Sequence, residues 1–223
     1  NIIIIDDRSS EDIKDLVFKE QFSYLRIDNP KGFNFSMLNN IPAKICKELG
    51  IETIVLWNSD LWCAKEEWFL ELLKRHKENL SYISGSKLLY PPEEMSIRGE
   101  TDTKNIVDHF PNMLDGKWRN TVQFGGDAWV AKFVGSKKKL FPIHYKRFTT
   151  PENHFVNCDR GCTFVTGALQ VIRLEWFIRS GGLNPSLSKN YQDTDLCLRA
   201  LQDNKRMFYF GKDIHFYHDE SAT

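Results

Sequence analysis

Carboxylates and one histidine stand at the ends of apolar segments, where side chains of these types can bind a cation. Asp60 closes the triplet Asn58-Ser59-Asp60 after the apolar segment from Thr53 to Trp57, and His218 ends the last apolar segment. Carboxylate oxygens are hard ligands for divalent cations, which can bridge diphosphate oxygens and take up charge on a leaving group. Asp60 is therefore a candidate ligand, with His218 as a second. Each also has a structural interpretation, as a turn cap and as a packed histidine.

Two acidic pairs stand beside expected helices. Asp6 and Asp7 follow four consecutive isoleucines, at the carboxyl end of an expected strand, where parallel sheets bind ligands, but they can equally cap the next helix. Asp193 and Asp195 start a helix and point to different sides of it, because they are two positions apart. Asp193 either caps that helix or faces a cleft, where a carboxylate can act as a general base toward a hydroxyl. Amides at a helix start would weaken such a base.

The pattern of apolar residues predicts the elements that position these side chains. Strands are expected over 2–5, 24–27, 53–57 and 82–84, with helices that include 41–49 and 65–77. Consecutive β-branched residues without alternation are typical of strands buried on both faces. The alternation of strands and helices predicts an α/β fold with a parallel sheet.

The regular pattern is lost over about 91–157, which we expect to form long loops with short strands. Order returns with 164–172, the helices 174–179 and 193–202, the strand 207–210 and the closing segment 214–218. A loop of this length in a compact domain is usually functional or mobile.

The composition argues against several classes of protein. The 223 residues carry 30 basic and 30 acidic side chains, so a broad basic surface for nucleic acid is not expected. No apolar stretch approaches the roughly 20 residues of a membrane span. Five scattered cysteines fit the reduced thiols of a cytoplasmic protein. Walker-type and GxGxxG phosphate motifs are missing from the sequence, and Cys158 and Cys162 lack the second pair that a zinc site needs.

The order of several motifs resembles that of the family 2 glycosyltransferases, which move a sugar from a nucleotide-sugar to an acceptor hydroxyl. The early motifs resemble the family's strand with Asp-Asp-Gly-Ser, a bacterial branch's Phe-Asn-Tyr-Ser…Asn-Asn, the DXD-like Leu-Asn-Asn-Asp, and Gly-x-Lys-Leu-Leu-Tyr-Pro. They lie at Ile2–Ser10, Gly32–Asn40, Leu56–Asp60 and Gly85–Pro91. The later motifs follow in family order: Thr166-Gly167-Ala168, Gly181-Gly182-Leu183-Asn184, Asp193-Thr194-Asp195-Leu196-Cys197-Leu198-Arg199 and His218-Asp219-Glu220-Ser221.

The resemblance implies a single domain over 1–223 with the GT-A (nucleotide-diphospho-sugar transferase) fold, an α/β fold whose mostly parallel central sheet is flanked by helices. Residues 1–90 would form the nucleotide-sugar-binding half, and 91–223 the acceptor-binding and catalytic half. We expect the chain to lack the family's first β-strand, which precedes the strand that ends at Asp6-Asp7.

The resemblance also implies a role for each candidate residue. Asp6, Asp7 and Asn58 would bind the nucleotide part of the donor, and Asp60 with His218 would hold Mn²⁺ or Mg²⁺ on its diphosphate. Asp193 would deprotonate the acceptor hydroxyl for in-line attack, which inverts the anomeric carbon. The implied partners are a nucleotide-diphosphate sugar and a glycan, lipid-linked glycan or protein acceptor, as in polysaccharide biosynthesis.

The irregular stretch 95–155 would form much of the acceptor side, with Trp118, Trp129 and Tyr145 as stacking platforms for a sugar ring. Two alternatives stay open. A degenerate GT-A domain could serve as a binding or scaffolding module, and a sugar-nucleotidyltransferase would need a Gly-rich, basic triphosphate loop in a region missing from this sequence. The presence of Asp60, Asp193 and His218 favours the transferase.

Overall fold

The computed structural model describes residues 1–63, 65–95, 112 and 117–219. The chain divides into two compact units. Unit 1 comprises Asn1–Ile54 and Arg173–Leu196, and unit 2 comprises Val55–Ile172 and Cys197–Thr223. Each unit is described by itself.

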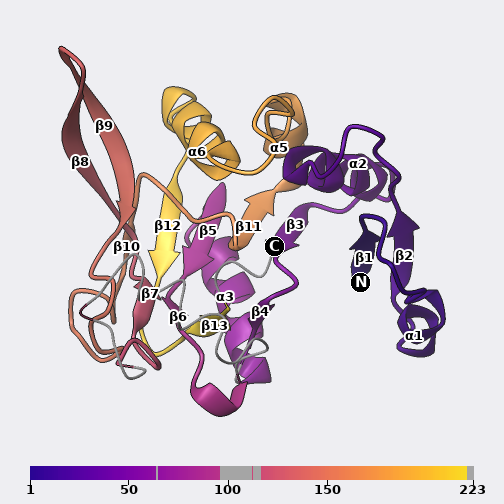
Figure 1. Cartoon of the computed structure of the whole chain (residues 1–223), viewed down its shortest axis with the longest axis horizontal. Helices are drawn as coiled ribbons and strands as arrows, with labels where there is room; N and C mark the ends of the chain where they lie inside the picture. Colours follow the sequence, from indigo (N-terminus) through magenta and orange to yellow (C-terminus); the bar gives the residue numbers. More distant parts are fainter. Residues whose placement is uncertain (64, 96–111, 113–116, 220–223) are drawn as a thin grey trace. The chain divides into compact units, whose positions relative to one another are not determined.

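Unit 1 begins with a two-stranded parallel sheet. Strands β1 (Ile3–Asp6) and β2 (Ser23–Arg26) pair from Ile3↔Ser23 to Asp6↔Arg26, and helix α1 (Lys14–Lys19) connects them (Figure 1). The isoleucines of β1 are only half-buried, so the strand buried on both faces that the sequence predicts is not formed. In the described part of the chain β1 pairs with β2 alone, and a two-stranded sheet cannot cover both faces of its strands.

Polar side chains of helix α2 (Phe35–Glu48) tie the Phe-Asn-Phe-Ser…Asn-Asn segment to the segment that follows helix α5 (Leu174–Arg179). Asn34 caps α2 by accepting the Met37 N–H, and its Nδ2 donates to the Pro185 carbonyl at 2.9 Å. Asn40 pairs with both backbone groups of Leu183, at 2.7 and 2.8 Å. Two motifs far apart in sequence therefore form one structural piece of unit 1.

The larger sheet has strand order β10-β12-β5-β11-β3. Strand β12 runs parallel to β5, whereas β11 is antiparallel to β5 and β10 is antiparallel to β12. The mostly parallel central sheet that the sequence predicts is therefore not confirmed. Parallel strands need a long crossover connection, but a long connection also allows an antiparallel strand. The length of the connection between β5 and β11 therefore does not fix the direction of β11. The strands are β3 (Thr53–Trp57), β5 (Ile83–Ser86), β10 (Asp159–Gly161), β11 (Leu169–Arg173) and β12 (Met207–Phe210).

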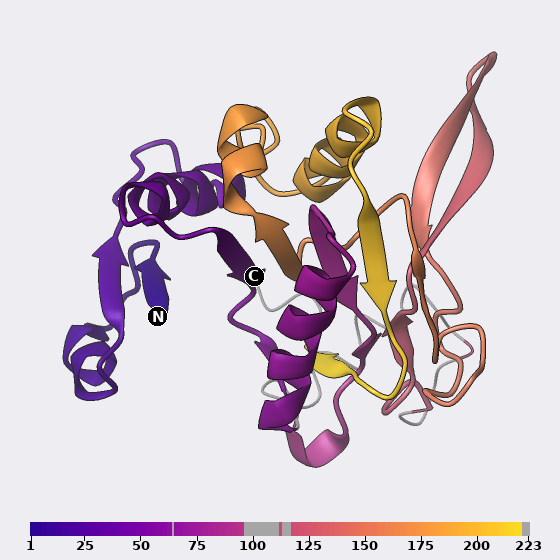
Figure 2. The ribbon, with the colours of Figure 1, turned by 180° about the vertical axis from the view of Figure 1, so that it is seen from behind.

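The core of unit 2 lies on and between its sheets. Helix α3 (Glu66–Glu78) contacts β5 and β12 (Figure 2), and Leu72 and His76 are its buried side chains. The fully buried side chains here are large and apolar, and their removal from water stabilises the unit. They include Leu72, Ile83, Val171, Tyr209 and Phe210.

A second, four-stranded sheet of unit 2 has the order β4-β13-β6-β7. Strand β13 is antiparallel to β4 and parallel to β6, and β6 is antiparallel to β7. The strands are β4 (Leu61–Trp62), β6 (Leu88–Leu89), β7 (Val122–Phe124) and β13 (Phe216–His218), with a 3₁₀ turn at Glu93–Met95 after β6. Helix α6 (Gln192–Gln202) precedes β12 along the chain.

The long irregular stretch contains one regular element that the sequence analysis did not predict. Strands β8 (Asp127–Val134) and β9 (Lys137–His144) pair along their whole length and extend away from the rest of unit 2 in both views (Figures 1 and 2). Gly135 at the tip has φ +61°, which fits the first position of a type II′ hairpin turn. Lysines interrupt the apolar alternation, which explains why the pattern read as loop.

Gly182 gives a test of the contact between the two motifs of unit 1. Its φ is +72°, and a Cβ there would collide with the Asn40 carboxamide, whereas Gly181 has φ +90° and open space around a Cβ. We expect Gly181→Ala to cost about 1 kcal/mol of unfolding free energy through backbone strain. Gly182→Ala should cost about 3 kcal/mol, because it also displaces the two Asn40–Leu183 hydrogen bonds. Equal losses for the two variants in urea unfolding would contradict this account.

Candidate functional site

The structure brings Asp60 and His218 together in unit 2. Asp60 lies in the turn between β3 and β4, and His218 ends β13, where it pairs in register with Leu61. The Asp219 N–H donates to the Asp60 carbonyl at 2.9 Å and closes the ladder. Backbone pairing thus places two residues side by side that are far apart in the sequence.

The two side chains meet at their polar ends in a nearly buried place. His218 Nε2 lies 3.1 Å from Asp60 Oδ1, and the side chains are 11% and 7% exposed. The contact does not meet the geometry of a hydrogen bond at Nε2. Proximity without hydrogen-bond alignment distinguishes this pair from an ordinary buried Asp–His pair.

Gln123 on β7 fixes the orientation of the His218 ring, and the sequence analysis missed it. Its Nε2 donates to the His218 carbonyl at 3.2 Å, so its Oε1 faces His218 Nδ1 at 2.7 Å. Because an amide oxygen only accepts, Nδ1 carries a proton, so in the neutral form of the ring the lone pair of Nε2 faces the Asp60 carboxylate. A single glutamine within an irregular stretch gives no sequence signal for this role.

This arrangement has the chemistry of a cation site. A neutral imidazole nitrogen and a carboxylate oxygen are both electron-pair donors, and a buried contact between them is unfavourable unless a cation or proton lies there. A histidine ligand oriented by a hydrogen bond at its other nitrogen is the usual second-shell pattern of protein metal sites. No group of three or more metal-ligating side chains occurs in the described residues, so a cation here would have two candidate protein ligands.

Asn58 shapes the turn that carries Asp60. Its N–H donates to the Ala168 carbonyl at 3.1 Å, and its own carbonyl accepts the Leu61 N–H at 3.1 Å. Its side chain is half-buried. The backbone of Asn58 therefore positions Asp60, and the nucleotide contact expected of its side chain stays a prediction.

Asp6 in unit 1 is engaged by the chain itself. Its carboxylate accepts the Tyr24 hydroxyl at 2.5 Å and the Ser9 N–H at 2.7 Å, and it pairs with Arg26 Nη1 at 3.0 Å. The Tyr24 hydroxyl, more than the Ser9 N–H and Arg26, lowers the pKa of Asp6 to about 2 against the opposing effect of burial. Asp6 thus closes the turn after β1 and does not cap α1, whose N-cap residue is Ile13. Asp7 is half-buried and lies 3.5 Å from Arg8 Nε.

Asp193 lies in the first turn of α6, in the part of that helix that belongs to unit 1. It is half-buried, and its Oδ1 accepts the Thr194 N–H at 2.7 Å. Tyr191, the residue before α6, has φ +65°, a conformation that costs energy for a residue with a side chain. The structure leaves the catalytic role of Asp193 a prediction.

The aromatic residues proposed as sugar platforms differ in exposure. Trp118 is 1% exposed and packs edge-on against Tyr90, so it offers no face to a sugar ring. Trp129 is half-buried and donates its indole N–H to Thr163 Oγ1 at 2.7 Å. Tyr145 is also half-buried, with Lys146 and Arg160 over its ring. The Glu220-Ser221 part of the closing motif lies outside the described residues.

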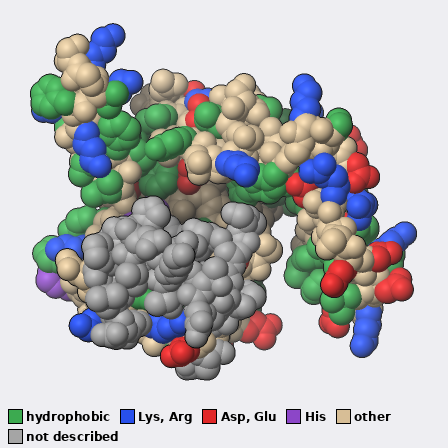
Figure 3. All heavy atoms as spheres, in the orientation of Figure 1, with side chains coloured by type: hydrophobic (Ala, Val, Ile, Leu, Met, Phe, Trp, Pro, Cys, Tyr) green, Lys and Arg blue, Asp and Glu red, His purple; other side chains and the backbone are tan. Residues whose placement is uncertain are grey.

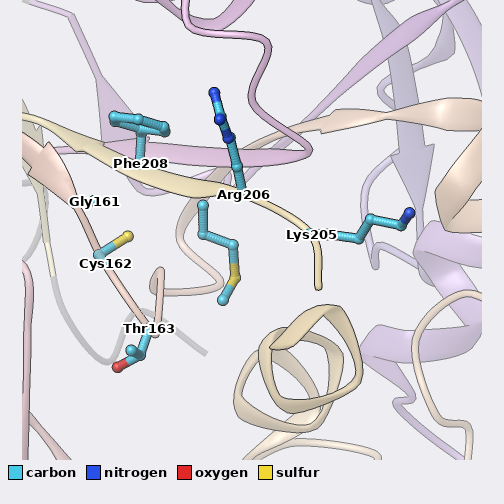
Figure 4. A pocket seen from close by; sticks show the side chains of 7 residues that line it. Gly161, Cys162, Thr163, Lys205, Arg206 and Phe208 are labelled. Atoms are coloured by element: carbon cyan, nitrogen blue, oxygen red, sulfur yellow. The ribbon is translucent and has the colours of Figure 1, made fainter. Parts of the chain in front are cut away.

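A hollow of about 340 Å³ in unit 2 lies elsewhere, between the end of β10 and the start of β12 (Figure 4). Burial raises the pKa of its Cys162 thiol, which makes that thiol a poor nucleophile. None of the predicted site residues lines this hollow, whose walls are Gly161, Cys162, Thr163, Lys205, Arg206, Met207 and Phe208.

Comparison with known proteins gives the fold a name. Neither a protein-family model nor a curated protein matches the sequence. Among solved structures, the chain is similar to the crystal structure of GalNAc-T7 with UDP, GalNAc and Mn²⁺, at a TM-score of 0.58 and 13% identity. The fold is GT-A-like.

The likeness covers 97% of this chain but 37% of the GalNAc-T7 chain, so this chain spans little more than a third of that protein. At this identity the GT-A-like fold is what the two share. None of the described helices has the length and hydropathy that crossing a membrane requires.

The hydrogen bonds of Asp6 predict a pH dependence of unit 1. A carboxyl with a depressed pKa stabilises the fold above its unfolded value, here 3.8, and that contribution is lost as the pH falls toward about 2. Tyr24→Phe removes the largest cause, so it should raise the Asp6 pKa, lower stability above pH 4 and flatten the loss between pH 4 and 2. Tyr191→Phe, at an exposed tyrosine of the same unit, is the matched control. Carboxyl NMR titration checks the pKa, and an unchanged Asp6 value in Tyr24→Phe would refute the assignment.

Proposed function

We propose that this protein is a glycosyltransferase that moves a sugar from a nucleotide-diphosphate donor to an acceptor hydroxyl, with a divalent cation held by Asp60 and His218. The observation that carries the proposal is the buried contact of His218 Nε2 with the Asp60 carboxylate, oriented by Gln123. The GT-A-like fold supports the nucleotide-sugar donor, since the similar GalNAc-T7 structure contains UDP and Mn²⁺.

The spacing of the two ligand atoms fits an octahedral cation. Adjacent ligands at about 2.1 Å from such an ion lie about 3.0 Å apart, and Nε2 and Oδ1 are separated by 3.1 Å. Mg²⁺ and similar ions commonly take one or two protein ligands and fill the remaining positions with substrate phosphate oxygens and water. A site with two protein ligands therefore suits a diphosphate donor better than a structural metal.

When bound, the cation would neutralise the charge that develops on the leaving diphosphate. Asp60 and His218 would hold that cation, and Gln123 would keep the His218 ring in the tautomer that can bind it.

We assign the general-base role to Asp193, on the resemblance of the Asp193–Arg199 segment to the family motif. Its carboxylate takes the proton of the acceptor hydroxyl as the acceptor oxygen bonds to the anomeric carbon. The bond from that carbon to the diphosphate breaks at the same time, its electron pair leaves with the nucleoside diphosphate, and the configuration is inverted. The acceptor class stays open between a glycan, a lipid-linked glycan and a protein.

The cation site is tested by Mn²⁺ titration in the presence of UDP, GDP or dTDP, followed by electron paramagnetic resonance. Asp60→Asn and His218→Ala each remove a ligand and should abolish tight Mn²⁺ binding with every nucleotide. Gln123→Leu should weaken it about 10- to 100-fold, because the His218 ring loses its orientation. Gln170→Leu is the matched control, since Gln170 is equally buried and donates to the Val165 carbonyl instead. Mn²⁺ affinity that survives loss of both ligands would sink the proposal.

The base is tested by nucleoside diphosphate release from UDP-, GDP- and dTDP-sugars with a panel of oligosaccharide acceptors. Asp193→Asn should slow acceptor-dependent release by about 100- to 10,000-fold. Its Mn²⁺ and nucleotide affinities should stay unchanged. Asp195→Asn, two positions along the same helix, serves as the control and should retain activity. Equal activity of the two variants would exclude Asp193 as the base.

A further inference from the structure

The β8–β9 hairpin of unit 2 presents apolar side chains to solvent. Every residue from 131 to 140 is exposed, and Phe133, Leu140 and Val134 are 75%, 67% and 47% exposed. In the described part of the chain the hairpin sheet pairs only with itself. Apolar side chains gathered on a projecting element are costly in water, and such a patch commonly marks an interaction surface.

The register places the most exposed apolar side chains on one face of the hairpin. Ala131 is opposite Leu140 and Phe133 is opposite Lys138, so Phe133 and Leu140 are diagonal neighbours on the same face. The other face carries the pairs Lys132↔Lys139 and Val134↔Lys137 near the tip. Lys138 shares the face of Phe133 and Leu140, so both faces of the tip carry apolar and basic side chains. Figure 3 shows green and blue side chains together on the hairpin at the upper left.

Beyond Asp127 at the base of β8, the charged side chains of the hairpin are all basic. Lysines occupy positions 132, 137, 138 and 139, and positions 128–143 contain no acidic residue, although the whole chain has zero formal net charge. Lys132 and Lys139 stand directly opposite each other, and like charges in that position destabilise a strand pair. A surface of negative charge would offset this repulsion, so the charge of the tip is complementary to an anionic partner.

We propose that the β8–β9 hairpin docks this protein on an anionic lipid bilayer, with its tip at the boundary between headgroups and acyl chains. Phe133, Val134 and Leu140 would enter the apolar side of that boundary, and the lysine ammonium groups would reach the lipid phosphates. A bilayer surface fits better than a protein groove, because the apolar and cationic side chains of the tip lie on both faces of the hairpin. The unpaired outer edges of the two strands limit the hairpin to the interface, since backbone polar groups are not left unsatisfied in hydrocarbon.

The inference is independent of the proposed transfer reaction, and its test measures binding alone. The full chain is sedimented with phosphatidylcholine vesicles that contain, or lack, phosphatidylglycerol. We expect binding to the anionic vesicles, little binding to the neutral ones, and weaker binding as salt is added.

Lys137→Gln with Lys139→Gln should weaken binding to the anionic vesicles about 25-fold, since each lysine near such a surface strengthens binding about fivefold. Lys44→Gln with Lys47→Gln removes the same charge from exposed positions on α2 and should leave binding unchanged. Phe133→Ser should weaken binding at constant charge. Leu70→Ser, at a leucine that is 61% exposed on α3, is its control.

Three results would overturn the proposal: no binding to anionic vesicles by folded protein, equal binding to neutral vesicles, or equal effects of hairpin and control variants. Thermal unfolding of each variant verifies the fold. The exposed hairpin positions predict midpoints unchanged from the wild type.

Discussion

The contact between His218 and Asp60 is the constraint on which the site in unit 2 depends. Backbone pairing of β13 with β4 sets the two residues next to each other, and Gln123 turns the imidazole so that its lone pair faces the carboxylate. Left without a cation or proton, this arrangement is unfavourable, because two electron-pair donors share a nearly buried space. The backbone hydrogen bonds of the surrounding strands hold the two residues in place despite this cost, as is usual for strained groups at functional sites. The fold thus gives up some stability to keep these two side chains in contact.

The sequence analysis predicted those elements whose buried residues form a clear apolar pattern in the sequence. The strand 53–57, the helix 174–179 and the strand 207–210 have the predicted bounds, because each is an apolar run ended by polar residues or glycine. The β8–β9 hairpin was missed because four lysines interrupt its alternation where both faces meet solvent. The sequence also could not predict that the large sheet contains both parallel and antiparallel pairs. The local pattern of apolar residues does not show which distant strand pairs with a given strand, or in which direction.

For the candidate site, the sequence indicated the two residues that meet in the structure but not the glutamine that orients one of them. Asp60 and His218 stand at segment ends that the apolar pattern marks, whereas Gln123 gains its role only through pairing in three dimensions. Some of the motifs that resemble the family's have a structural role instead of a chemical one. Asn34 and Asn40 form hydrogen bonds with the backbone that follows Gly181-Gly182, so their role in this protein is structural. The residues of a family's motif can therefore be needed for the fold as well as for the chemistry.

The same distinction separates the two aspartates after β1. Both oxygens of Asp6 are engaged by Tyr24, Ser9 and Arg26, and its low pKa measures how strongly those partners hold the carboxylate. A nucleotide could be bound by Asp6 only at the expense of these bonds, which a buried carboxylate cannot give up cheaply. Asp7 forms an ion pair with its neighbour Arg8, which is long at 3.5 Å and easily rearranged. If unit 1 supplies a carboxylate to the donor, the physical argument therefore favours Asp7, with Asp6 as the residue that fixes the turn on which Asp7 is carried.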